Sequence, residues 1–229
     1  MNEISDDDSS NKSNRKIKRI DGHYIIEEIQ SAFSFEKGFL YTVKELTINP
    51  GTGVKEFLDK DRKRLIKPIL FLIFTSLIYS ILNNFLLIED GYIKYSGETQ
   101  SSIFKLFEWI QQNYGYSNIL IAIFIGLWTK LFFIKYDFNI FEILILLSFV
   151  MGYAMLIFSL FAIFQALINQ DIMQIAAIIA FIYTSWAIGQ FYGKRKVINY
   201  IKAFFAYILG MISFTILVIL IGIALDLLK

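Results

Sequence analysis

Three charged residues in or beside predicted membrane spans are the side chains best placed for chemistry in this chain. Lys130 falls within an apolar run, Glu142 begins the next run, and Arg195 follows a later one. An ionisable side chain in lipid is costly, so its presence points to function. Two interpretations of Lys130 stay open: its long stem carries the ammonium to the membrane interface, or Lys130 pairs with Glu142 across the short turn between their spans.

The other polar side chains within the apolar runs are uncharged, and such groups usually hydrogen-bond between membrane helices. Gly189 with Gly193, and Ala206 with Gly210, are small residues four apart that favour close approach of helices. A transport pathway through the membrane would have to be lined by Asn83, Asn84, Gln165, Asn169 and Lys130.

Signatures of enzymes and metal sites are missing from the sequence. The chain has no cysteine, and its one histidine, His23, stands alone, so we predict no metal site and no cofactor. Residues 51–55 read GTGVK, which lacks the spacing of a phosphate-binding loop. We expect no catalytic residue and no enzymatic activity.

The elements that position these side chains are predicted to be membrane helices. The chain of 229 residues is 56% hydrophobic and 18% charged, with a mean hydropathy of +0.55, whereas soluble domains are about 45–50% apolar and about 25% charged. A helix needs about 20 apolar residues to cross a bilayer. Five runs qualify, which predicts an all-α integral membrane bundle of five transmembrane helices over residues 68–229, with spans at 69–88, 118–136, 143–168, 172–192 and 203–225. Between the first two spans, Ile103, Leu106 and Ile110 form one apolar face of a further short helix.

Basic residues predict the orientation of the spans, because Lys and Arg accumulate in cytoplasmic loops. With the N-terminus in the cytoplasm and the C-terminus outside, 19 of the 22 Lys and Arg residues fall on the cytoplasmic side. The topology predicted in this way is a multi-pass membrane protein with five crossings.

The N-terminal region divides into a tail and a group of amphipathic helices. Residues 1–20 are polar and predict a disordered cytoplasmic tail, whose basic cluster favours anionic lipid over nucleic acid. Residues 21–67 predict short juxtamembrane helices, a cytoplasmic collar lying in the interface or packed on the bundle. The apolar positions of these helices are Ile25, Ile29, Phe39, Leu40, Val43, Leu46, Val54, Phe57, Leu58 and Leu65. The residues that we expect to contact anionic lipid or a protein partner are Arg62, Lys63, Arg64 and Lys67.

Motifs in and after the collar resemble those of a bacterial membrane family known as domain-of-unknown-function family 3667. Residues 35–46 read FEKGFLYTVKEL, residues 49–51 read NPG, and residues 62–68 read RKRLIKP. Further on, KLFF at 130–133, NIFE at 139–142 and FYG at 191–193 are similar to segments of the same family. Members commonly begin with a cysteine-rich zinc ribbon and have histidine where this chain has Ile143. The resemblance implies a multi-pass protein of the bacterial inner membrane and no established activity.

Three functions remain as alternatives. The first is a non-enzymatic membrane adaptor or regulator that binds a partner, or a second copy of itself, through the basic collar. The second is a small-solute or ion transporter or channel, although the spans lack acidic residues for proton coupling. The third is a membrane enzyme acting on lipid head groups through Lys130, Glu142 and Arg195.

Overall fold

The computed structural model describes residues 38–86 and 101–228. The predicted tail at 1–20, the start of the collar and part of the loop after the first span lie outside this range. Residues 37–229 form one compact unit. From here on, the collar means residues 38–67.

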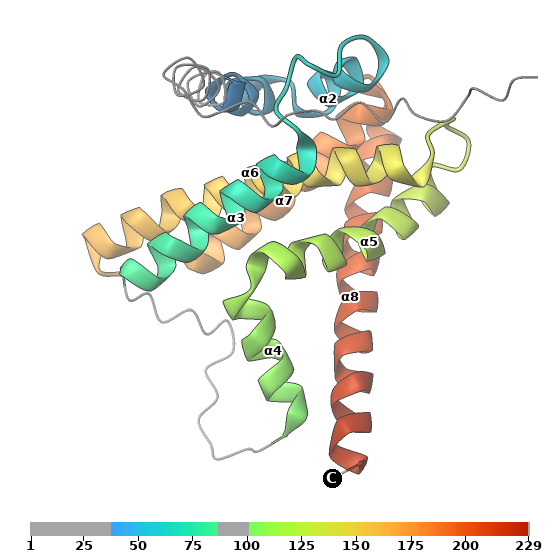
Figure 1. The fold of residues 1–229 in the computed structure, drawn as a ribbon. Helices are drawn as coiled ribbons and strands as arrows, with labels where there is room; N and C mark the ends of the chain where they lie inside the picture. Colours follow the sequence, from blue (N-terminus) through green and yellow to red (C-terminus); the bar gives the residue numbers. More distant parts are fainter. Residues whose placement is uncertain (1–37, 87–100, 229) are drawn as a thin grey trace, which may run out of the picture. The chain divides into compact units, whose positions relative to one another are not determined.

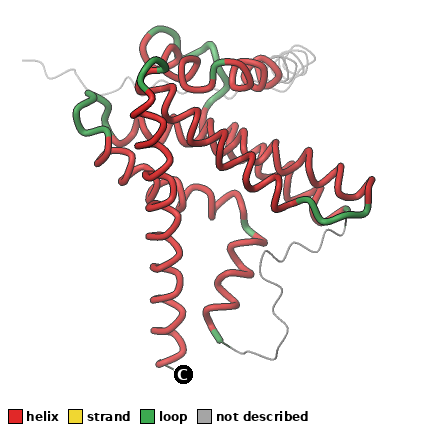
Figure 2. The backbone as a smooth tube through the Cα atoms, turned by 180° about the vertical axis from the view of Figure 1, so that it is seen from behind, coloured by secondary structure: helices red, strands yellow, loops and turns green. Residues whose placement is uncertain are grey.

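Every regular element in the described ranges is a helix, which confirms the predicted all-α class (Figures 1 and 2). Residues 38–48 are helical, and the later helices are α2 (Pro50–Asp59), α3 (Pro68–Phe85), α4 (Ser102–Gln112), α5 (Tyr114–Phe132), α6 (Ile140–Ile168), α7 (Met173–Gly193) and α8 (Val197–Leu227).

Four helices, namely α3, α6, α7 and α8, are long and apolar enough to cross a membrane. The second predicted span, 118–136, corresponds to α5, which meets α4 at a bend of 102°, and the two together count as a fifth candidate span. The short helix predicted between the first two spans is confirmed as α4. The chain therefore has four to five candidate spans, in agreement with the predicted bundle.

Helix α6 is the centre of the bundle formed by α3 and α5–α8. It packs most extensively on α3 and also contacts α5 and α7, while α8 packs on α5 and α7. In α6, 61% of the apolar window is buried, against 22% in α8 and 28% in α3. The outward faces of α3 and α8 carry many exposed Ile, Leu and Phe side chains, as expected of surfaces solvated by lipid.

The small residues predicted to permit close helix contact do so at two positions. A Cβ added to Gly210 would lie 2.6 Å from the Cα of Ile125, so α8 and α5 touch backbone to backbone there. A Cβ on Gly189 would lie 2.9 Å from the Cα of Tyr200. Gly193 serves differently, because its φ of 137° ends α7 in a conformation that favours glycine.

The collar helices end earlier than the apolar pattern predicts. The Asn-Pro-Gly turn interrupts the helices only at Asn49, because Pro50 is accommodated in the first turn of α2. Helix α2 ends at Asp59, so Leu65, predicted to share its apolar face, is instead buried in the loop before α3. Leu40 was expected to be buried and is 60% exposed, because Phe39, Val43 and Leu46 form the inward face.

We predict that Gly210→Ala lowers the free energy of unfolding by about 1–3 kcal/mol, because the new methyl group overpacks the α5–α8 contact. The matched control is Gly126→Ala in α5, whose Cβ would meet its nearest neighbour at an ordinary 3.4 Å. Chemical denaturation of both variants in detergent micelles checks this. Equal stability of the two variants would contradict the close contact.

Candidate functional site

The collar is attached to one end of the bundle by hydrogen bonds that cross to α6 and α7. The side-chain oxygen of Gln190 accepts hydrogen bonds from the backbone N–H groups of Gly51 and Thr52, at 2.8 and 3.1 Å. The hydroxyl of Tyr183 donates to the carbonyl of Leu46 at 2.9 Å. Of the two placements that the sequence left open, packing on the bundle is the one observed.

Gln190 acts as the N-cap of a helix to which it does not belong. The first N–H groups of a helix have no intrahelical acceptor, and the side chain of Asn49 at the N-cap position of α2 makes no capping bond. Gly51 lies against the backbone of α7, where a Cβ would clash with Phe191 and Ala187. Because Gly51 has no side chain, the N-terminal end of α2 packs closely enough on α7 for Gln190 to reach it.

Arg64 holds the collar helices together. Its guanidinium forms ion pairs with Glu56 of α2 and with Glu45, the latter at 3.2 Å, and its Nε donates to the hydroxyl of Tyr41 at 2.8 Å. The bond from Arg64, followed by that from Lys60, lowers the pKa of the Glu56 carboxyl below its ordinary value of 4.5. The bonds to Tyr41 and then Glu56 raise the pKa of Arg64.

Beside this network, Thr42 connects the helix at 38–48 to the loop before α3. Its buried hydroxyl accepts from the N–H of Ile66 at 3.0 Å and donates to the carbonyl of Gly38 at 2.8 Å. These contacts hold the loop near its C-terminal end, at Ile66, against the helix at 38–48.

The predicted lipid-contact and partner-contact residues therefore divide into two groups. Arg64 is half-buried in intramolecular ion pairs. Arg62, Lys63 and Lys67 are exposed, and their side chains form no ion pair or hydrogen bond within the described ranges. Of these four residues, Arg62, Lys63 and Lys67 are the ones that the described structure leaves exposed.

The candidate functional charges lie near the same end of the bundle but not in one site. Lys130 donates to the carbonyl of Phe138 at 2.6 Å, and Glu142 forms a capping box with Asn139 at the start of α6. The ion pairs recorded for the described residues do not include Lys130 with Glu142. Arg195 is exposed in the turn after α7.

The residues proposed for a transport pathway divide between the two ends of the bundle, with Lys130 at the collar end and the other four at the remote end. Asn83 and Asn84 lie at the end of α3 remote from the collar, and Lys130 lies at the collar end of α5. Gln165 accepts from the N–H of Ile172 in the turn to α7, and Asn169 ends α6 in a left-handed conformation. Within the described part of the chain, no group of three or more His, Cys, Asp or Glu residues could hold a metal ion.

The fold and this site define a multi-pass α-helical membrane protein with a docked collar. Residues 36–80 match the family described as "Protein of unknown function (DUF3667)", so the resemblance is confirmed over the collar and much of α3. No curated protein and no solved structure matches the chain. The match adds no activity, because the family has none assigned.

The contribution of Gln190 was missed by the sequence interpretation, and it can be tested directly. We predict that Gln190→Leu lowers the free energy of collar docking by about 1–3 kcal/mol, since two buried N–H groups lose their acceptor. Hydrogen exchange should then accelerate at residues 50–59, whereas the exposed control Gln174→Leu on the same helix should leave it unchanged. Unchanged protection in Gln190→Leu would refute the docking bond.

The ion pair of Glu56 predicts a pH dependence. Because its pKa is lowered by folding, its stabilising contribution is complete above pH 4.5 and is lost as the pH falls through the lowered value. Glu56→Gln should therefore unfold at a lower temperature than the wild type at about pH 7, and the difference should diminish as the pH falls below 4.5 and through the lowered pKa. Thermal unfolding in micelles measures this, with Asp59→Asn, an exposed carboxylate of α2, as the control. A difference that does not change with pH would contradict the assignment.

Proposed function

We propose that this multi-pass membrane protein is a non-enzymatic adaptor or regulator that binds an acidic cytoplasmic protein through Arg62 and Lys63 of its collar. The observation that carries the proposal is the division of the basic residues: Arg64 is held by two carboxylates, while its neighbours Arg62 and Lys63 are exposed.

The fixed position of the collar supports this proposal. Buried bonds from Gln190 and Tyr183 attach it to α7, and Arg64 joins its helices to one another. A charged surface on a preorganised element binds with a smaller loss of conformational entropy than one on a mobile tail. Complementary charge also accelerates encounter with an oppositely charged partner.

Exposed apolar side chains on the collar also suit a protein partner. Leu40 and Ile48 on the helix at 38–48 are 60% and 58% exposed, and protein interfaces combine apolar and charged side chains. Lys67 directly precedes α3, a candidate span, which suits contact with anionic lipid head groups.

The orientation and location belong to the same proposal. The excess of Lys and Arg in residues 1–67 supports an N-terminus in the cytoplasm. The collar and the C-terminal end of α8 lie at opposite ends of the described unit (Figure 1), which agrees with an odd number of crossings and a C-terminus outside. The family resemblance favours a bacterial inner membrane.

The test is photocrosslinking in native membranes from a benzophenone amino acid placed at Ile48. We expect one major protein adduct, and the double charge reversal Arg62→Glu/Lys63→Glu should reduce its yield at least tenfold, because it repels an acidic surface. The control is Lys194→Glu/Lys196→Glu, which reverses two exposed basic residues beyond α7 and should leave the yield unchanged.

Membrane insertion and the thermal unfolding midpoint of both double variants are measured alongside. An adduct that persists after reversal of Arg62 and Lys63 would overturn the assignment of these residues. An adduct only to the protein itself would overturn the adaptor function.

A further inference from the structure

Two cavities of different chemistry meet at Tyr114, far from the collar. One, of about 300 Å³, lies among α3 and α5–α8 and is lined mainly by apolar and aromatic side chains. The other, of about 260 Å³, lies between the end of α3 and the α4–α5 bend and is lined mainly by polar side chains. Tyr114 lines both.

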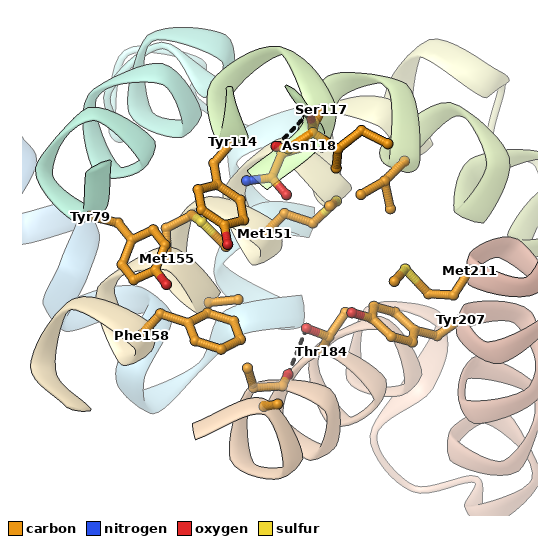
Figure 3. A pocket seen from close by; sticks show the side chains of 15 residues that line it. Tyr79, Tyr114, Ser117, Asn118, Met151, Met155, Phe158, Thr184, Tyr207 and Met211 are labelled. Atoms are coloured by element: carbon orange, nitrogen blue, oxygen red, sulfur yellow. Dashed lines mark hydrogen bonds between the residues drawn. The ribbon is translucent and has the colours of Figure 1, made fainter. Parts of the chain in front are cut away.

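The apolar cavity has the character of a site for a hydrocarbon chain. Figure 3 shows Tyr79 and Phe158 on one side of it and Tyr207 and Met211 on the other. Two of its hydroxyl side chains have internal partners: Ser117 donates to the carbonyl of Ile110 at 3.0 Å, and Thr184 donates to that of Ala180 at 2.8 Å. Most of the other lining side chains are aliphatic or aromatic.

The volume of this cavity bounds the size of its occupant. A cavity of about 150 Å³ with apolar walls binds one benzene ring. At about twice that volume, the cavity among α3 and α5–α8 has room for roughly a dozen carbon atoms.

The polar cavity has the character of a site for a neutral, hydroxyl-bearing head group. Side-chain amides of Asn83, Asn84, Gln111 and Gln112 line it together with the carboxylate of Glu108. Its described lining contains no Lys or Arg, so a phosphate would meet a carboxylate and no cation. Amides donate and accept hydrogen bonds, which matches hydroxyl groups.

One buried acceptor beside this cavity points to a donor that the chain does not supply. The amide oxygen of Asn83 is buried and has no hydrogen-bond partner among the described residues. Leaving a buried acceptor unsatisfied is unfavourable, and rotation of the Asn83 side chain toward the cavity that it lines would bring this amide to a ligand hydroxyl.

We propose that the paired cavities bind one amphiphile with a neutral hydroxylated head, such as a monoacylglycerol, head in the polar cavity and chain in the apolar cavity. The contact of both cavities with Tyr114 places the junction of head and chain at that residue. This site is separate from the collar and does not depend on the adaptor function.

The experiment uses the full chain in phosphatidylcholine nanodiscs with a diazirine analogue of 1-lauroylglycerol, whose twelve-carbon chain suits the apolar cavity. Mass spectrometry locates the labelled residues, which we expect at 151–158 and 207–211. Ala154→Phe fills the apolar cavity and should reduce this labelling at least tenfold. Ala166→Phe, on an exposed position of the same helix α6, should change it less than twofold.

Two further arms test the head group. Excess 1-lauroylglycerol should displace the probe, and excess laurate, with the same chain and an anionic head, should not. Asn83→Leu should reduce labelling at least threefold and keeps the proposal testable if Ala154→Phe does not fold. Equal displacement by laurate, labelling that is unaffected by both variants, or labelling spread over the outward faces of the helices would each overturn the site.

Discussion

The position of the collar on the bundle depends on the two hydrogen bonds that the side chain of Gln190 accepts from backbone N–H groups of α2. Gly51 and Thr52 lie in the first turn of α2. Without Gln190, their N–H groups would have no hydrogen-bond acceptor where α2 packs on α7. Because Gln190 lies near the end of α7, this bond fixes one collar helix to the bundle. Arg64 pairs with Glu56 of α2 and with Glu45, and these ion pairs fix the helix at 38–48 relative to α2.

The motif residues that suggest a family are largely structural. Asn139 and Glu142 cap α6, Phe133 stacks on Tyr192 with ring centroids 3.8 Å apart, and Gly193 ends α7. The remaining exposed charges of the collar are therefore the positions at which external contact is proposed. The amphiphile site contains no residue of the collar, so the two proposals can fail independently.

Hydropathy and helical periodicity were sufficient for the architecture, because lipid requires long apolar helices whatever their partners. They predicted the ends of α3 and α5–α8 closely, apart from the start of α8, which lies at Val197 and not at 203. Gln190 and Arg64 could not be assigned in the same way, since their partners lie 139 and 19 residues away in sequence. Lys130 and Glu142, whose pairing the sequence left open, each have a local backbone partner. The two cavities exist only through packing, so no local pattern indicates them.

The measurement that tests the docked collar most directly is the distance between one spin label at the end of α2 and another directly after α7. The chain has no native cysteine, so Asp59→Cys and Lys194→Cys, both exposed, can be labelled without background. Double electron–electron resonance on the protein in nanodiscs should give one narrow distance distribution. A broad or bimodal distribution would show that the collar is not fixed to the bundle and would contradict the account.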